Sequence, residues 1–360
     1  MQFDQTRMSG NFEFQIETMK CNLIKQGYPQ GSCLTEVEGK KVVACEATLK
    51  QTDNGPFRLI SSVHLSRPEN YLSIYQSGCN FSCRKCHCWT FTKIAKGDWW
   101  SPGDVLKACK EYERGVTLRE PRNRATAFHA HDSCRCCGSC VMYGKRSSLC
   151  PKVIQKKEIL LSPQGWGPAR NIVAFTGGDL TCCPEFYIQS TRLIKAETDL
   201  WVLIETNGYG LTPQNLDALK EAGVDSFWLD IKAYDETDHK WLTGCFNRNL
   251  LKLPEEIIKR GFVLEVLSLY IPNLVETSQL KKIAQHLFDV DPEIPFTILA
   301  FFPEYQMKRY KSPKVSEMIE AYNAVRATGL RNVRLRNTGI FAATKEDHHL
   351  LKEKVGAGNY

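Results

Sequence analysis

Seven short segments rich in β-branched and aromatic residues recur along the chain, and each ends in turn-forming residues. Segments of this length and composition predict β-strands. Between most of them lie stretches with apolar residues at helical spacing, and Gly223, Gly261 and Gly329 stand where such helices would end. The predicted strands span residues 71–77, 171–178, 200–208, 225–233, 262–272, 295–303 and 332–339, and the clearest helices span 102–114, 212–223, 253–261, 277–288 and 316–329.

From residue 171 onward, predicted strands and helices alternate at spacings of roughly 25–37 residues. Such alternation indicates parallel strands joined by helical crossovers. The pattern therefore predicts an α/β fold, either a barrel or an open doubly wound sheet. In both cases the carboxyl ends of the strands lie at one edge, where catalytic residues gather.

The alternation is interrupted once, by about 95 residues between the first two of these strands. We expect residues 1–70 to form a small β-rich cap, residues 71–340 the barrel, and residues 341–360 a C-terminal tail. The interruption reads as a cysteine-rich insertion at 100–170. Because residues 115–150 contain few apolar side chains, we expect metal coordination rather than packing to order them.

The composition is that of a globular domain, since hydrophobic residues make up 42% and charged residues 24% of the 360 residues. The net charge is +7, but the basic residues are scattered, so no nucleic-acid partner is expected. No apolar run approaches the roughly 18 residues of a membrane span, and the opening segment lacks the features of a signal peptide. These features predict a cytoplasmic protein without membrane contact.

Sixteen cysteines are unusual for such a protein, because thiols that cluster in a reducing compartment more often bind metal than form disulfides. Most of them fall into groups, while the dispersed ones are expected to be buried and inert. One group holds Cys79, Cys83, Cys86 and Cys88, another holds Cys134, Cys136, Cys137, Cys140 and Cys150, Cys182 and Cys183 are adjacent, and the dispersed cysteines are Cys21, Cys33, Cys45, Cys109 and Cys245.

The first group follows the first predicted barrel strand with the spacing Cys-x3-Cys-x2-Cys. Three thiolates on a tight loop can hold three corners of a cubane 4Fe–4S cluster, which leaves the fourth iron open. The alternative is a zinc site completed by His87 or Cys88. Zinc more often uses paired Cys-x2-Cys elements, so the x3 gap is less typical of it.

This spacing resembles the signature of the radical S-adenosylmethionine (SAM) superfamily, in which the open iron binds SAM. The resemblance implies that Cys79, Cys83 and Cys86 ligate the cluster and are essential for catalysis. Residues 176–179 resemble the superfamily's Gly-Gly-Glu motif, with aspartate in place of glutamate, and further polar residues follow at successive strand ends. The cofactor-binding residues that the resemblance implies are Gly177, Gly178, Asp179, Glu205, Asn207, Asp230, Lys232 and Tyr270.

Residues 60–68 and 228–244 resemble, more narrowly, the branch that contains the activating enzymes of glycyl-radical enzymes. The likeness covers roughly residues 60–340 and implies a partial (β/α)6 barrel. It also implies cleavage of SAM to a 5'-deoxyadenosyl radical, an electron donor such as ferredoxin or flavodoxin, and a protein substrate. The cofactors would perform the difficult chemistry, while the protein orients them and excludes water.

The second group has too few cysteines for the two cubane clusters of a ferredoxin-like insertion, which need about eight. Cys137 and Cys140, with two of Cys134, Cys136 and Cys150, could hold one iron or zinc ion or one auxiliary cluster. Such a loop is similar to that of enzymes that modify methyl-coenzyme M reductase, which include a cobalamin-dependent glutamine C-methyltransferase. Cobalamin follows from this likeness alone, because the chain lacks the Asp-x-His-x-x-Gly motif.

Three functions are therefore open. The favoured one is a radical SAM enzyme that methylates a glutamine of methyl-coenzyme M reductase. The second is a glycyl-radical-enzyme activating enzyme, which removes one hydrogen from its partner. The third is a zinc-binding interaction protein without catalytic activity.

Overall fold

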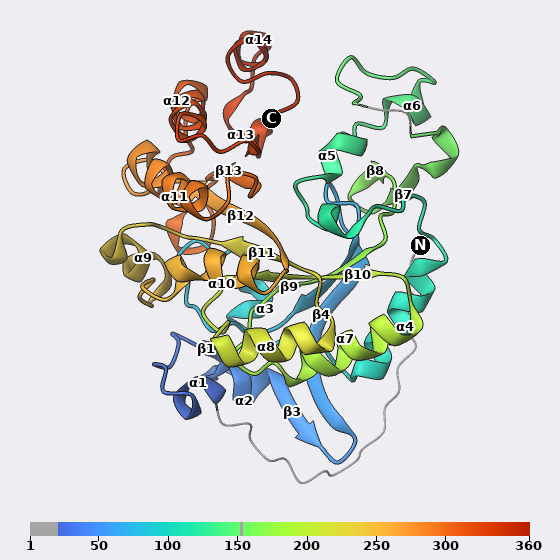
Figure 1. Cartoon of the computed structure of the whole chain (residues 1–360), viewed down its shortest axis with the longest axis vertical. Helices are drawn as coiled ribbons and strands as arrows, with labels where there is room; N and C mark the ends of the chain where they lie inside the picture. Colours follow the sequence, from blue (N-terminus) through green and yellow to red (C-terminus); the bar gives the residue numbers. More distant parts are fainter. Residues whose placement is uncertain (1–20, 152–153) are drawn as a thin grey trace.

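A computed structural model describes residues 21–151 and 154–360 of the chain, so the opening segment lies outside the described residues. Its centre is a ten-stranded sheet (Figure 1). All seven predicted strands are present, and neighbours among them pair in parallel. In spatial order they are β5 (Leu72–Gln76), β9 (Ile172–Gly177), β10 (Trp201–Thr206), β11 (Ser226–Asp230), β12 (Val263–Tyr270), β13 (Phe296–Ala300) and β14 (Val333–Arg336).

The predicted helices are also present, and local sequence explains their limits. The Thr212 side chain accepts a hydrogen bond from the Asn215 backbone N–H at the start of α8, and Gly223 ends that helix with φ of 95°. This is the usual pairing of an oxygen cap with a left-handed glycine. The helices of the barrel are α7 (Glu185–Glu197), α8 (Pro213–Ala222), α9 (Glu236–Thr243), α10 (Leu253–Lys259), α11 (Thr277–Val290) and α12 (Val315–Arg326).

The parallel sheet continues on one side into antiparallel strands. These are β4 (Gly55–Leu65), which pairs with β5, and β3 (Leu49–Thr52) and β6 (Asp98–Trp100), which both pair with β4. The expected boundary at residue 70 therefore falls within one continuous sheet. Beside it lie the hairpin of β1 (Leu34–Val37) and β2 (Lys40–Val43) and the helices α1 (Asn22–Lys25) and α2 (Ala44–Thr48).

The insertion between β5 and β9 begins with α3 (Trp89–Thr92) and the predicted α4 (Pro102–Glu113), which packs beside α7. It continues through the short helices η1 (Arg122–Arg124), α5 (Ala130–Ser133), α6 (Ser139–Met142) and η2 (Lys156–Glu158) to the hairpin of β7 (Leu160–Ser162) and β8 (Gly165–Gly167). In Figure 1 the later part of the insertion, around α5, α6, β7 and β8, lies across from α12–α14.

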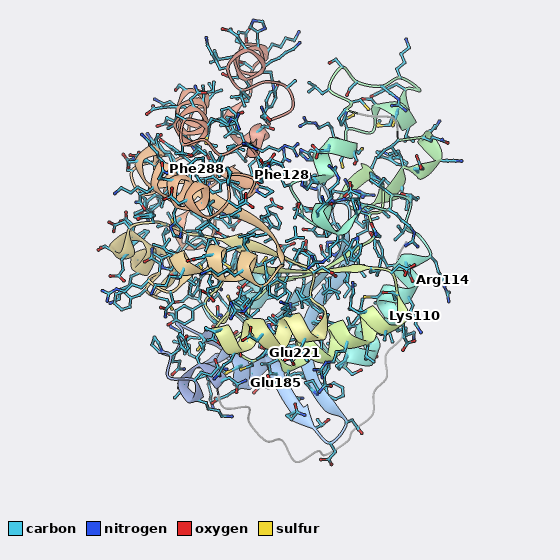
Figure 2. All side chains as sticks on the ribbon, in the orientation of Figure 1. Lys110, Arg114, Phe128, Glu185, Glu221 and Phe288 are labelled. Carbon is cyan, nitrogen blue, oxygen red and sulfur yellow. The ribbon has the colours of Figure 1, made fainter. Side chains whose placement is uncertain are left out.

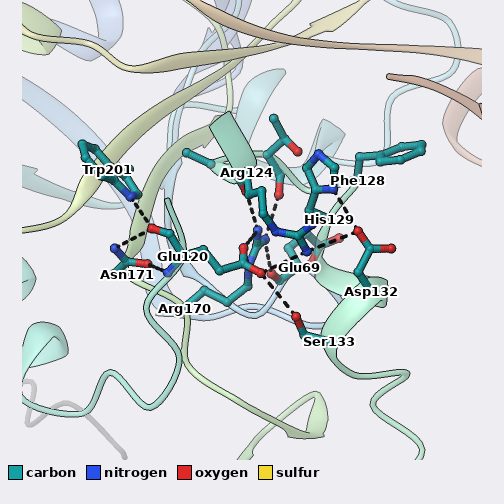
Figure 3. Close-up of polar contacts among 12 residues, drawn as sticks. Glu69, Glu120, Arg124, Phe128, His129, Asp132, Ser133, Arg170, Asn171 and Trp201 are labelled. Carbon is teal, nitrogen blue, oxygen red and sulfur yellow. Dashed lines mark hydrogen bonds and ion pairs between the residues drawn. The ribbon is translucent and has the colours of Figure 1, made fainter. Parts of the chain in front are cut away.

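The first half of this insertion is held by buried polar contacts (Figure 3), which corrects the expectation that metal alone would order residues 115–150. Arg170 is fully buried and forms an ion pair with Glu120. The same guanidinium donates to the carbonyl oxygens of Arg124, at 2.6 Å, and of Thr126, at 2.7 Å. The small number of apolar residues in 115–150 does not predict this arrangement, because its stability comes from hydrogen-bonded, paired charges rather than from buried hydrophobic area.

Phe128 marks the contact between the insertion and the last barrel strands (Figure 2). Its backbone N–H donates to Glu265 of β12 at 2.7 Å, and its carbonyl oxygen accepts from Arg334 of β14. The predicted tail contains α14 (Lys345–Lys354), preceded by α13 (Thr338–Phe341), and buries Leu351. Of the helices described, none is long and apolar enough to cross a membrane.

Candidate active site

The loop that carries Cys79, Cys83 and Cys86 lies between β5 and α3, at the carboxyl ends of the parallel strands. All three side chains line one cavity of about 260 Å³. The cavity therefore joins the cysteine motif to the ends of several strands, as predicted. Its lining includes Cys79, Cys83, Cys86, Cys88, Thr176, Gly177, Asp179, Glu205, Asn207, Trp228, Asp230 and Lys232.

Burial raises the pKa of the Cys79 thiol, against the opposing influence of Lys93. It raises the pKa of Cys83 to about 12, although Lys232 favours the thiolate. Buried thiols in this setting stay protonated near neutral pH unless a stronger positive charge displaces the proton. An iron centre supplies such a charge, so the donor set fits a thiolate-bound cluster.

Asp179 is buried and fully engaged by neighbouring loops. One carboxylate oxygen accepts from the Thr181 N–H and hydroxyl, both at 2.8 Å. The other accepts from the Thr206 hydroxyl at 2.6 Å and the Asn207 N–H at 2.9 Å. Asp179 thus ties the end of β9 to the end of β10, and its binding of the SAM ammonium stays a prediction.

Gly178 is required by a close approach between backbone segments. A Cβ atom at this position would lie 1.9 Å from the carbonyl oxygen of Gly78, which directly precedes Cys79. Gly178 is absent from the residues that line the cavity, whereas Gly177 is among them. The glycine pair therefore lets two loops meet, in addition to any contact with cofactor.

Asn207 connects the β10 end directly to the cysteine loop. Its side-chain NH2 donates to Asn80 at 2.6 Å and lies 3.7 Å from the Cys79 sulfur. Hydrogen bonds to cluster sulfurs tune iron–sulfur sites. Two residues that the sequence predicted for separate motifs are thus in contact.

Glu205 lies inside the barrel mouth and accepts hydrogen bonds from Tyr71 at 2.9 Å and Thr176 at 2.5 Å. Burial raises the pKa of its carboxyl group to about 8. Across the cavity, Asp230 and Lys232 form an ion pair. Burial alone would lower the pKa of Lys232, but Asp230 and the nearby thiols raise it above its ordinary value.

Sequence reasoning missed two cavity residues with unpartnered polar atoms. The Lys85 ammonium lies 3.4 Å from the Phe302 ring centre, and burial lowers its pKa to about 8. The Trp228 N–H and one Asp230 oxygen are buried without partners in the described structure. The strand period could have located Trp228, since it lies two positions before Asp230 on the same face. Conversely, Tyr270 is buried but does not line this cavity.

The second cysteine group surrounds a much smaller cavity, of about 20 Å³, which Cys134, Cys137, Cys140 and Cys150 line together with Trp166. That volume suits one water-sized species. Cys136 does not line this cavity; its sulfur contacts the side-chain oxygen of Asn70 at 3.3 Å and interacts with the Cys134 thiol. The geometry therefore favours Cys134 and Cys150 as partners of the Cys137–Cys140 pair, and ligation by Cys136 stays a prediction.

Neither group is preassembled around a single ion. Within residues 21–151 and 154–360, no three histidine, cysteine or acidic side chains converge as the ligands of one metal do. A cubane does not require such convergence, because each thiolate binds a different iron.

A larger cavity, of about 520 Å³, opens near Tyr28, Tyr209, Phe246 and Glu256. It shares no lining residue with the 260 Å³ cavity of Cys79, Cys83 and Cys86.

Comparison with known proteins identifies the central region. Residues 131–287 match the family model described as the radical SAM superfamily; the match begins after the Cys79–Cys86 loop. A relative from Methanocaldococcus jannaschii, named as a glycyl-radical enzyme activating enzyme, is 31% identical over 135 residues, which are 36% of this chain and 50% of the relative. The chain thus spans half the length of that curated relative.

Solved structures with detectable likeness are remote in sequence. Streptococcus suis SuiB aligns over 77% of this chain and 53% of its own, with 14% identity and a TM-score of 0.45. A domain of a pyruvate-formate lyase-activating enzyme from Bacteroides vulgatus aligns over 45% of this chain and 97% of its own, with 17% identity and a TM-score of 0.39.

Residues 131–287 are therefore similar to the radical SAM superfamily, and the predicted α/β partial-barrel fold is confirmed. The parallel part of the sheet has seven strands, one more than the resemblance implied, because β14 pairs with β13. The family implies a 4Fe–4S cluster and SAM as cofactors.

Proposed function

We propose that this protein is a radical SAM enzyme that modifies a residue of a protein substrate. The observation that supports the proposal is one cavity lined by Cys79, Cys83 and Cys86 together with the ends of β9, β10 and β11. When bound, the cluster and SAM supply a 5'-deoxyadenosyl radical, using one electron from a donor such as ferredoxin or flavodoxin, and release methionine.

The chain's own residues would hold and orient these groups. The three thiols would ligate iron after losing their protons, and Lys232 lies where its charge offsets theirs. The Trp228 N–H and the free Asp230 oxygen could bond the polar groups of SAM, because neither has a protein partner in the described structure. Asp179, whose backbone carbonyl accepts from the Asn80 N–H at 2.9 Å, and Gly178 would hold the β9 end against the cysteine loop.

For the reaction itself, we infer C-methylation of a glutamine in methyl-coenzyme M reductase. The cysteine-rich loop supports this choice, since four of its five thiols line a cavity that suits one iron or zinc ion. Cobalamin, which the likeness implies, would supply the methyl group in that reaction. No residue of the described structure is assigned to it.

Activation of a glycyl-radical enzyme is the second candidate. It is favoured by the printed function of the M. jannaschii relative, which is 31% identical over 135 residues. In that reaction the partner would lose one hydrogen atom and keep the radical. A third possibility, a zinc-binding interaction protein without catalysis, would leave the strand-end residues of the cavity unused.

The decisive experiment is anaerobic reconstitution with iron and sulfide, followed by SAM and dithionite. Release of 5'-deoxyadenosine is expected, and its absence from a preparation that carries a full cluster would favour the interaction protein. Incubation with candidate substrate proteins then separates the two reactions by mass spectrometry. A gain of one methyl mass supports methylation, whereas oxygen-dependent cleavage at a glycine supports activation.

A further inference from the structure

Four cysteines from three distant segments of the sequence lie together beside α1 and α2. Cys21 directly precedes α1, Cys45 lies in α2, and Cys182 and Cys183 stand just before α7. Cys45, Cys182 and Cys183 are buried, and Cys21 packs against the same apolar cluster. Sequence reasoning expected Cys21 and Cys45 to be isolated inert thiols and assigned no role to the adjacent pair.

The sulfur atoms of these residues contact one another. All four belong to or pack against one apolar cluster. Within it the Cys183 thiol interacts with those of Cys182 and Cys45, and Cys182 interacts with Cys21, so the four thiols form one connected group. In a tetrahedral site with metal–sulfur bonds of about 2.3 Å, neighbouring sulfurs lie about 3.8 Å apart. The four sulfurs do not surround a common point in the described structure, so binding an ion would require side-chain rotations.

The surroundings also provide donors to these sulfurs. The backbone N–H groups of Leu23 and Ile24 lie near the Cys21 sulfur, although Cys21 forms no side-chain cap bond to α1, and the backbone N–H of Asn22 lies near Cys183. Asn22 is itself fixed at 2.7 Å by Glu185, the first residue of α7 (Figure 2). Backbone donors of this kind stabilise metal-bound thiolates and orient them.

We propose that Cys21, Cys45, Cys182 and Cys183 bind one thiophilic divalent ion, zinc or ferrous iron, as a structural tetrathiolate site. Ion binding releases the thiol protons and exchanges the S–H contacts for four metal–sulfur bonds. None of the four forms a disulfide in the described structure. Cys33 lies nearby but bonds to Gln30 and the Gly31 carbonyl instead, so it stays outside the ligand set.

This site would stabilise the loop that follows β9, which includes Asp179. Cys182 follows Asp179 by three positions, and the loop between them closes the end of β9. A Cβ atom on Gly210, in the loop after β10, would lie 2.1 Å from the Cys182 backbone nitrogen. The loops that follow β9 and β10 are therefore in close contact at Cys182. An ion bridging this loop to α1 and α2 would tie the N-terminal segment to the edge of the active site.

The test measures metal content in the full chain, purified without oxygen and supplied with Zn²⁺. The double variant Cys182→Ala with Cys183→Ala should contain one metal equivalent less than the wild type. The matched control, Cys33→Ala with Cys109→Ala, also removes two buried thiols and should keep the wild-type content. Equal metal content in both double variants would overturn the proposal.

A second measurement uses the wild-type chain and does not depend on how the variants fold. A chelator should expose Cys21, Cys45, Cys182 and Cys183 to an alkylating reagent together, and added Zn²⁺ should protect them again, as followed by peptide mass spectrometry. Protection that is independent of chelator, or a disulfide among these residues, would overturn the proposal. SAM cleavage plays no part in either readout, so the outcome is separate from that of the proposed function.

Discussion

The two cysteine groups singled out by the sequence are held in different ways. Cys79, Cys83 and Cys86 stand on a short loop between a central strand and α3, and the thiols of Cys79 and Cys83 lie deep enough for burial to raise their pKa. Cys137, in the insertion, is exposed and bonds only to neighbouring polar groups such as Ser147, at 3.6 Å. The sheet positions the first group, whereas the second depends on its own loop.

The two groups also differ in the size of the cavity that they line. The first opens on a cavity of about 260 Å³ lined by strand ends, and the second encloses about 20 Å³ beside Trp166. A cubane with an organic cofactor requires the larger volume, while a single ion requires only the smaller one. Two groups of clustered cysteines therefore predict different metal centres once the surrounding fold is known.

The largest effect is expected from removing the first group. Changing Cys79, Cys83 and Cys86 together to Ala should eliminate about four irons per chain and abolish SAM cleavage, since each thiolate supplies one corner. Iron analysis and 5'-deoxyadenosine release measure this. Cys88→Ala is the matched control and should keep both. If the triple variant still releases 5'-deoxyadenosine, the cysteine-lined cavity is not the site of this chemistry.

The next effect tests how closely the first group depends on the sheet. Gly178→Ala places a Cβ atom 1.9 Å from the Gly78 carbonyl, so the β9 end and the cysteine loop must separate. We expect a loss of both cluster iron and SAM affinity, with affinity falling tenfold or more. Gly339→Ala is the control, because its Cβ would meet nothing within 4 Å. Normal iron loading in Gly178→Ala would show that the two loops move independently.

A smaller effect is expected from the second group. The double change Cys137→Ala with Cys140→Ala should lower metal content by one equivalent and make the loop sensitive to protease, since a closed loop loses its tie. SAM cleavage should persist, while modification of the protein substrate should fall. Cys136→Ala serves as control, because Cys136 does not line the cavity that the other four cysteines share. Unchanged metal content in the double variant would show that Cys137 and Cys140 are not metal ligands.

Much of the barrel was predictable because its strands are short apolar runs bounded by turns, and all seven were found. The site was predictable to the extent that parallel strands bring their carboxyl ends together, which placed Glu205, Asp230 and Lys232 beside the cysteine loop. Tyr270 also ends a strand but does not reach the cavity. A strand end fixes the edge of the sheet, but not the direction of each side chain.

What the sequence could not predict depends on contacts between distant segments. Arg170 and Glu120 are 50 positions apart, and the sequence around neither residue predicts their buried ion pair. The meeting of Cys21 with Cys182 likewise requires the N-terminal segment to pack against a barrel loop. Local periodicity reports the elements and their order, whereas such pairings arise only when the chain is folded.

The smallest expected effect concerns the link between the two regions. Glu265 of β12 is buried and accepts from the Phe128 N–H, in the insertion that carries the second cysteine group. Burial raises the pKa of its carboxyl group from 4.5 to about 7, although Phe128, Thr297 and nearby arginines oppose that shift. The folded chain therefore binds this proton more tightly than the unfolded chain does.

The sign of the pH dependence follows from that difference. Stabilisation by the protonated group is complete below pH 4.5 and is lost as the pH rises through about 7. Glu265→Gln keeps an acceptor for Phe128 without titrating, so wild-type stability should fall more steeply than that of the variant between these limits. Melting temperatures across this range measure the effect, with exposed Glu346→Gln as control. Parallel curves for wild type and Glu265→Gln would mean that Glu265 stays ionised in the folded chain, and that the insertion is joined to the barrel by a charged contact.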